Sequence, residues 1–209
     1  MRLFHHPFSS NARRAVVTAK HLAEHHASAP SVELVLVDLA KGEQRSAAFL
    51  HMNPNGKVPV LDDDGFFLTE SHAIQIYLAE KTPGQTLYPS ELRARADVNR
   101  WLFWNAHHFA PAVAVLNWER VVKPMLGRGA ADPKEIARGE MLLGECFRVL
   151  DQHLGDHEHV SGPQLSLADI ALATPLTTIG AAKLPIEGRT HILRWFERIS
   201  SLPAWRATS

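Results

Sequence analysis

Strand signals in this chain are concentrated before residue 69 and nearly vanish afterwards. Short apolar runs predict strands at residues 2–4, 32–39, 57–61 and 66–68. Amphipathic patterns predict helices at residues 11–26 and 70–81. The run at 32–39 is almost continuously apolar, which is typical of a buried strand lying parallel to the first strand after a helical crossover. The predicted order is therefore βαβ followed by ββα, an α/β arrangement.

The character of the sequence changes at residue 82. The stretch TPGQTLYPS contains two prolines and a glycine, so we interpret residues 82–90 as a linker. Beyond it, long helical patterns follow at residues 91–122, 133–155, 167–180 and 189–200. We therefore expect an α/β domain at 1–81 and an all-α domain at 91–209.

Composition excludes several classes of function. Lysine plus arginine and aspartate plus glutamate number 22 each, and no basic run marks a nucleic-acid surface. No stretch approaches the roughly 18 apolar residues that a membrane span needs. The single cysteine, Cys146, does not allow a disulfide framework. We expect a cytoplasmic protein of 209 residues that acts on small molecules, without nucleic-acid or membrane partners.

One strand contains an unusual proline. Pro59 lies within the run KVPVL, between an Asn-Gly turn and an Asp-Gly turn. Proline removes a backbone donor, so such a strand is either at the edge of a sheet or uses its backbone for another purpose. The residues alone leave both readings open.

Four segments together resemble the cytosolic glutathione S-transferases. They are HPFSSNARRA, FLHMNPNGKVPVLDDDGFFLTES, HHFAPAVAVLNWERVVKPMLG and SLADIALATPL, and the resemblance covers the whole chain. The pattern is closest to the phi class, with theta-like relatives next. It implies a thioredoxin-like N-terminal domain followed by a helical domain, glutathione as substrate, and a homodimer engaged in detoxification.

The resemblance also implies roles for individual residues in glutathione binding. Ser9 matches the catalytic serine, although Ser10 and Asn11 are close rivals and any of the three is also suited to capping a helix. Val58 would pair its backbone with the cysteinyl part of glutathione, with a cis peptide bond into Pro59. The remaining contacts would come from Glu70 and Ser71 to the γ-glutamyl end, and from Gln44, Arg45 and Lys57 to the glycyl carboxylate. The phi pattern has His-Lys in place of Gln44 and Arg45, and Gln in place of Lys57.

A hydrophobic electrophile is the second substrate that the resemblance implies. It would bind between the domains near Phe8, Trp104, His108 and Ala112, side chains that are equally compatible with core packing. Two other functions stay open: a glutathione-dependent peroxidase or disulfide reductase, and a non-catalytic binding module with the same fold. The absence of a C-x-x-C motif argues against a protein-thiol redox centre.

Three further motifs have other interpretations. His21 to His25, HLAEH, matches the H-x-x-E-H pattern of some zinc peptidases. Helical spacing places its histidines and Glu24 opposite the apolar stripe, so we expect it to face solvent and predict no metal site. We interpret Ser166 to Asp169 as a helix-capping box with a structural role. We interpret Cys146, on an apolar helix face, as a small buried hydrophobic residue.

Overall fold

A four-stranded mixed sheet organises the N-terminal part of the computed structural model, which describes residues 1–208. Its strand order is β2-β1-β3-β4. β1 runs parallel to β2 and antiparallel to β3, and β4 is antiparallel to β3. The strands are β1 (Arg2–His5), β2 (Glu33–Leu36), β3 (Val60–Asp63) and β4 (Phe66–Leu68). This is the predicted βαβ-ββα arrangement of a thioredoxin-like domain.

Two strand predictions were wrong in detail. The segment 32–39 forms only the four-residue β2, which lies at the edge of the sheet and not in its interior. Leu34 and Leu36 are 37% and 62% exposed, because an edge strand has a neighbour on one side only. The strand expected at 57–61 begins at Val60, after the peptide bond between Val58 and Pro59, which is cis.

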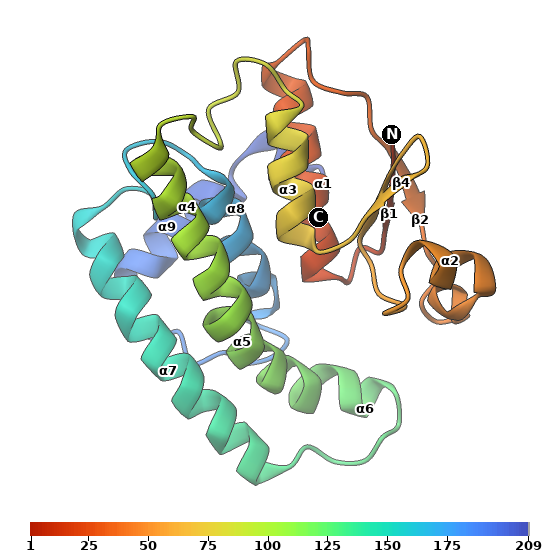
Figure 1. Cartoon of the computed structure of the whole chain (residues 1–209). Helices are drawn as coiled ribbons and strands as arrows, with labels where there is room; N and C mark the ends of the chain where they lie inside the picture. Colours follow the sequence, from red (N-terminus) through yellow and green to blue (C-terminus); the bar gives the residue numbers. More distant parts are fainter. Residues whose placement is uncertain (209) are drawn as a thin grey trace. The chain divides into compact units, whose positions relative to one another are not determined.

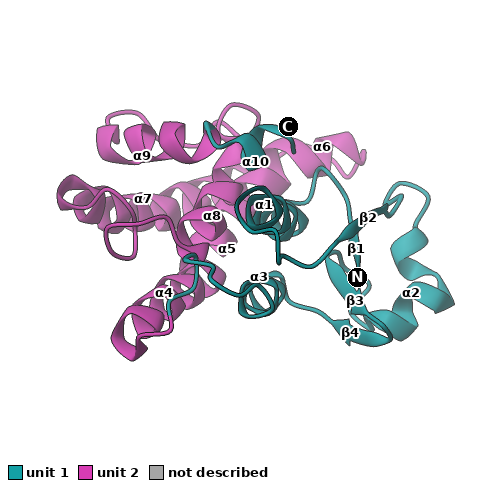
Figure 2. Ribbon diagram, turned by 90° about the horizontal axis from the view of Figure 1, so that it is seen from above, with its two compact units in different colours: residues 1–89, 201–209 teal, residues 90–200 magenta. Residues whose placement is uncertain are grey.

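Helices cover both faces of this sheet. α1 (Ser10–His25) and α3 (Ser71–Glu80) lie on one face, and α2 (Ala47–Met52) lies on the other (Figures 1 and 2). α2 and the preceding 3-10 turn η1 (Glu43–Arg45) lie in a segment for which the sequence predicted no helix. A six-residue helix presents too few turns for apolar periodicity to be visible.

The second compact unit comprises residues 90–200, whereas residues 201–208 group with residues 1–89 (Figure 2). The sequence pattern predicted that this C-terminal segment belongs to the helical domain. It contains the short helix α10 (Pro203–Arg206), and the guanidinium of Arg13 on α1 lies 4.7 Å from the ring centre of Trp205. This cation–π contact between α1 and α10 lies within the first unit.

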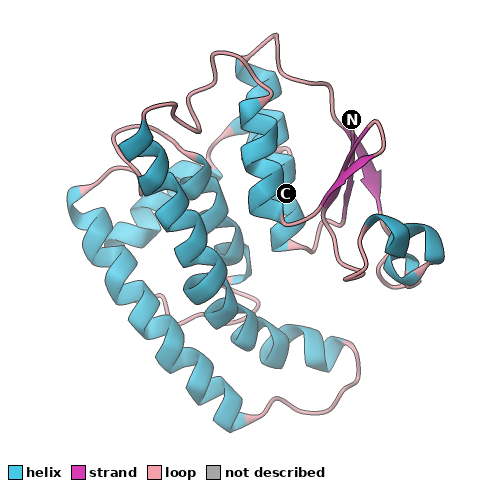
Figure 3. Ribbon diagram, in the orientation of Figure 1, coloured by secondary structure: helices cyan, strands magenta, loops and turns pink. Residues whose placement is uncertain are grey.

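Residues 90–200 are helical wherever they are regular (Figure 3). The helix predicted at 91–122 is continuous from Leu92 to Met125, but two π-helical segments interrupt its α-helical geometry. Its parts are α4 (Leu92–Trp104), η2 (Asn105–Phe109), α5 (Ala110–Asn117), η3 (Trp118–Val122) and α6 (Lys123–Met125). The other helices of this unit are α7 (Pro133–Asp156), α8 (Leu167–Ala173) with the 3-10 segment η4 (Thr174–Thr178), and α9 (Thr190–Ser200).

A close helix crossing forms the core of this unit. A Cβ atom on Gly139 of α7 would stand 2.9 Å from Leu116 Cδ2 on α5, so glycine lets the two helices approach without displacing that side chain. Phe109 and Phe147 pack beside this crossing with ring centres 6.0 Å apart. Within residues 1–208, no helix combines the length and the apolar character needed to cross a membrane.

Candidate functional site

The strand register brings the predicted site loops to one edge of the sheet, the one at which β1, β2 and β4 end and β3 begins. Phe4 near the end of β1 pairs with Val60 at the start of β3, and Leu68 at the end of β4 pairs with Leu61. β2 runs parallel to β1, so it ends at the same edge. The four loops that follow β1, follow β2, precede β3 and follow β4 therefore gather there (Figure 1). They carry Ser9, Gln44–Arg45, Lys57–Pro59 and Glu70.

Ser9 occupies the N-cap position of α1. Its backbone is extended (φ −92°, ψ 109°), and its Oγ accepts a hydrogen bond of 3.2 Å from the backbone N–H of Ala12. A hydroxyl has two acceptor lone pairs and one donor, so this cap leaves the hydroxyl proton available. Ser10 is already the first helical residue, and Asn11 is exposed in the first turn. Of the three rivals, Ser9 alone combines the cap with a position before the helix.

Val58 lies beside the start of α1. Its side chain is 8% exposed and packs in a cluster with Ala12, Val37, Phe49 and Val60. The turn before it is held by the buried Asn53, whose Nδ2 donates a 2.6 Å hydrogen bond to the carbonyl oxygen of Lys57. This packing fixes the backbone of the loop at the sheet edge. The cis bond after Val58 agrees with what the family resemblance implies.

Gln44 and Arg45 contact the same loop through Gly56. Gly56 has a φ of +57°, and a Cβ atom there would stand 3.0 Å from both the Gln44 carbonyl oxygen and Arg45 Nη1. Only glycine fits this backbone geometry and this spacing without strain. The structure therefore places Gln44 and Arg45 next to the residue that precedes Lys57. Arg45 and Lys57 are exposed, so two cationic side chains are available to an anion.

The N-terminus of α3 differs from those of α1 and α2. Ser9 caps α1 and Ser46 caps α2, but no side chain makes a capping hydrogen bond from the Glu70 position of α3. The first N–H groups of a helix and its dipole favour an anion. Glu70 itself has a φ of +64°, a left-handed conformation that is strained for a side chain with a Cβ.

Sequence reasoning missed Arg14, which lies beneath this helix start. Its side chain is 2% exposed, and its Nη1 lies 3.4 Å from Ser71 Oγ and 2.9 Å from His72 Nδ1. Burial lowers the pKa of Arg14 to about 9. The adjacent pair in NARRA offered no signal that one arginine is buried, because α1 carries polar residues on its buried face. That face continues with Thr18, whose Oγ1 accepts a 2.9 Å hydrogen bond from Gln75 of α3.

The residues expected to contact the electrophile have different environments. Phe8 is 90% exposed and His108 is exposed. Trp104 is half-buried, and its ring stacks on Phe109 with centres 5.6 Å apart. Ala112 is 2% exposed and belongs to the helical core, so it offers almost no surface to a ligand. His108 lies in the π-helical segment η2, a distortion of the kind often found at functional sites.

Cys146 lies in the core of the helical unit. Its residue is 8% exposed on α7, and burial raises the pKa of its thiol to about 11, with a smaller contribution from Glu145. A redox-active cysteine needs an accessible thiolate. The expectation of a buried structural cysteine is confirmed.

Comparison with known proteins identifies the family. Residues 1–80 match the N-terminal domain of glutathione S-transferases, and residues 133–198 match the C-terminal domain. Glutathione S-transferase F10 of Arabidopsis thaliana, a phi-class protein, is 38% identical over 210 residues, covering 97% of this chain and 94% of the relative. Human glutathione S-transferase theta-2 is 37% identical over 175 residues, covering 81% of this chain and 70% of the relative.

Solved structures agree with the sequence relatives. Glutathione transferase F7 from Populus trichocarpa has a TM-score of 0.85 at 31% identity, covering 99% of this chain and 96% of that one. A glutathione S-transferase-I bound with lactoylglutathione also has a TM-score of 0.85, at 25% identity, covering 99% and 97%. The fold is thus a thioredoxin-like domain followed by a helical domain. The chain belongs to the glutathione S-transferase family, with phi-class and theta-class relatives as the sequence predicted.

Proposed function

We propose that this enzyme adds the thiolate of glutathione to electrophilic small molecules, with Ser9 as the residue that stabilises the thiolate. The observation that carries this proposal is the geometry of Ser9. Its Oγ accepts from Ala12 N–H at the start of α1, which leaves its proton to be donated toward the sheet edge. The helix dipole of α1 favours negative charge at the same place.

The chemistry requires little beyond binding and ionising the thiol. A free thiol has a pKa of about 8.5, so only a few per cent of it is thiolate at neutral pH. Lowering that pKa by one unit corresponds to about 1.4 kcal/mol, which one charge-assisted hydrogen bond supplies. The thiolate then forms a bond to the electrophilic carbon, and with an aryl halide the halide ion leaves with the electron pair of the broken bond.

Glutathione binding would be shared among the loops at the sheet edge. The uncapped N-terminus of α3 and Ser71 would bind the γ-glutamyl carboxylate, and the exposed Glu70 would bind the ammonium group. The backbone of Val58, which precedes Pro59, would pair with the cysteinyl unit. Arg45 and Lys57, with Gln44 beside Gly56, would bind the glycyl carboxylate. Charge complementarity supports the assignments at the two ends of the tripeptide, because each ionised group there would meet an opposite charge or a helix N-terminus.

Several finer points follow the family resemblance. We propose that Phe8, Trp104 and His108 contact the hydrophobic electrophile, and we leave out Ala112 because it is buried. We also propose a cytoplasmic homodimer that serves detoxification. The peroxidase or disulfide-reductase alternative is not favoured by the named relatives. The buried thiol of Cys146 supports the same conclusion for any mechanism that uses a protein thiol.

Thiolate absorbance of bound glutathione, followed against pH, tests the role of Ser9. In Ser9→Ala we expect the bound thiol to titrate about one pH unit higher, and turnover at neutral pH to fall by about tenfold or more. Glutathione should still bind, since its carboxylates contact other residues. Ser10→Ala and Asn11→Ala should titrate like the parent enzyme.

Two controls complete this experiment. Ser46→Ala removes an equivalent helix cap from α2, so it reports the loss of stability that follows from capping alone, about 1 kcal/mol. Parallel assays with an aryl halide and with a hydroperoxide compare conjugation with peroxidase activity. A parent-like titration in Ser9→Ala, with an upward shift in Ser10→Ala or Asn11→Ala, would transfer the role to that neighbour. Hydroperoxide reduction without conjugation would refute the proposed reaction.

A further inference from the structure

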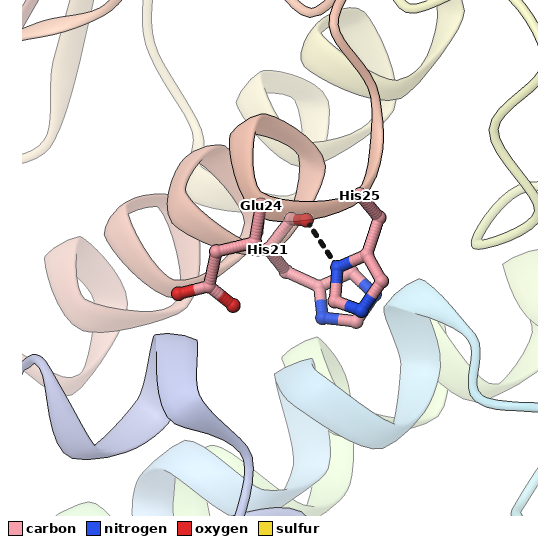
Figure 4. Close-up of side chains that lie close together, drawn as sticks. All are labelled: His21, Glu24 and His25. Carbon is pink, nitrogen blue, oxygen red and sulfur yellow. Dashed lines mark hydrogen bonds between the residues drawn. The ribbon is translucent and has the colours of Figure 1, made fainter.

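Three potential metal ligands converge near the C-terminal end of α1. One side-chain ligand atom from each of His21, Glu24 and His25 lies within 4.8 Å of the other two (Figure 4). The sequence pattern predicted that this motif faces solvent and holds no metal. Glu24 and His25 are indeed exposed, but His21 is half-buried and its ring stacks on His25 with centres 4.2 Å apart. The structure therefore gathers the three groups into one cluster.

The hydrogen bonding of His25 suits its ring to bind a metal ion. His25 Nδ1 lies 2.8 Å from the backbone carbonyl oxygen of His21, drawn as the dashed line in Figure 4. Because a carbonyl oxygen only accepts, Nδ1 must carry the proton in this contact. In the neutral ring, Nε2 then holds the lone pair. Metal-binding histidines characteristically donate their second ring nitrogen to such an acceptor, which fixes the tautomer.

His21 is the half-buried member of the cluster. Its Nδ1 has no hydrogen-bond partner among the described residues, so no hydrogen bond from that atom opposes a small rotation of the ring.

We propose that His21, Glu24 and His25 form a binding site for a divalent transition-metal ion of the zinc type. Two imidazoles and one carboxylate are ligands that zinc accepts, with a fourth position open to water. At bond lengths of about 2.1 Å, tetrahedral ligand atoms lie roughly 3.4 Å apart. We expect small rotations of the exposed Glu24 side chain and of the His21 ring to bring the three ligand atoms from within 4.8 Å of one another to that spacing.

A second stacked pair on α7 shows what distinguishes this cluster. His153 and His157 have ring centres 4.2 Å apart, and His157 Nδ1 lies 2.9 Å from the His153 carbonyl oxygen. The arrangement matches that of His21 and His25. However, His153 Nε2 is engaged with the Val160 carbonyl oxygen at 3.1 Å. Among the residues that the structure describes, only the α1 cluster brings three such groups together, so the α7 pair provides a matched control.

The proposed site is separate from the glutathione site. His21 is twelve positions after Ser9, which corresponds to about 18 Å along an α-helix. A metal ion there would bridge two turns at the end of α1 and stabilise the folded state by mass action. We therefore expect a structural effect on α1 and no part in the conjugation chemistry.

Titration of zinc chloride into the tag-free, chelator-treated enzyme tests the proposal. The titration must be made without glutathione, because its thiol also binds zinc. Calorimetry should show one tight site per chain, and zinc should raise the melting temperature. His25→Gln should weaken this site by about tenfold or more, and Glu24→Gln should weaken it by a smaller factor. In ¹⁵N spectra of the imidazoles, zinc should shift the resonances of His21 and His25 first.

The controls make the outcome decisive. His157→Gln should bind zinc like the parent, and conjugation by the parent protein should be the same before and after chelator treatment. Because Glu24 and His25 are exposed, their variants should fold even if His21→Gln does not. Parent-like zinc affinity in His25→Gln, an equal loss in His157→Gln, or no tight site in the parent would each overturn the proposal.

Discussion

At the scale of single residues, Ser71 joins the proposed glutathione site to the buried core. Its Oγ lies 3.4 Å from the guanidinium of Arg14 while its backbone begins α3. We expect Ser71→Ala to weaken glutathione binding by about 1–3 kcal/mol, because a charge-assisted hydrogen bond to the carboxylate is lost. Calorimetry of glutathione binding measures this directly.

A matched serine controls for nonspecific effects. Ser28 is exposed and bonds only weakly to the Pro83 carbonyl oxygen, at 3.4 Å, so Ser28→Ala should bind glutathione like the parent. Unchanged affinity in Ser71→Ala would remove Ser71 from the proposed site. In that case the contact between Ser71 and Arg14 would have only a structural role.

Cys146 provides a prediction about pH. With its pKa raised to about 11 by burial, the thiol is protonated across the neutral range. A raised pKa in the folded state means that burial of the neutral thiol contributes its full stability below pH 9. This contribution is lost as the pH rises toward 11. At pH 8 we expect a thiol reagent to label the folded protein at least about tenfold more slowly than the denatured protein.

A companion variant separates packing from chemistry. Cys146→Ser should leave the conjugation rate per folded molecule nearly unchanged, since the thiol lies in the core of the helical unit. Fast labelling of the native protein, or a large loss of rate in a variant with normal melting behaviour, would revive a redox role for Cys146.

At the scale of elements, Asp169 organises the start of α8. The predicted capping box with Ser166 is confirmed. The carboxylate also accepts hydrogen bonds of 2.9 Å from Val160 N–H and from Trp195 Nε1, so it links α8 to α9 and to the loop before it. The sequence indicated the cap but not these two distant donors. Neither is close to Asp169 along the chain.

We expect Asp169→Ala to lower the free energy of unfolding by at least about 3 kcal/mol, because several buried donors lose their acceptor together. Urea denaturation measures the loss. Asp132→Ala is the control, since Asp132 caps α7 in an exposed position through Lys134 N–H and should lose only about 1 kcal/mol. Equal losses in the two variants would show that Asp169 acts as a simple cap.

The elements also show where sequence patterns succeed. Long amphipathic stretches such as α7 were predicted within a residue or two, because many turns repeat the same signal. β2 was misjudged because an apolar run does not reveal whether a strand has one neighbour or two. The π-helical segments η2 and η3 were not predicted, because each is a short distortion inside a helix that continues on both sides.

At the scale of the whole molecule, the division into an α/β part and a helical part was readable from the sequence. The assignment of residues after 200 was not, because it depends on Trp205 meeting Arg13, which lies almost the whole chain length away. The residues proposed to bind glutathione could be named only through the family resemblance. The burial of Arg14 was not predicted, because burial of this charged side chain depends on tertiary contacts with α3 that local sequence patterns do not encode.

The strained backbone of Glu70 has a consequence for protein engineering. A side chain held at a φ of +64° costs roughly 1–3 kcal/mol, and glycine would remove most of that cost. A selection for thermal stability alone would therefore favour Glu70→Gly, even though the change removes the carboxylate proposed to bind the ammonium group of glutathione. Stability and substrate recognition compete at this position, so a stabilised variant of the enzyme should be screened for glutathione affinity before Glu70 is altered.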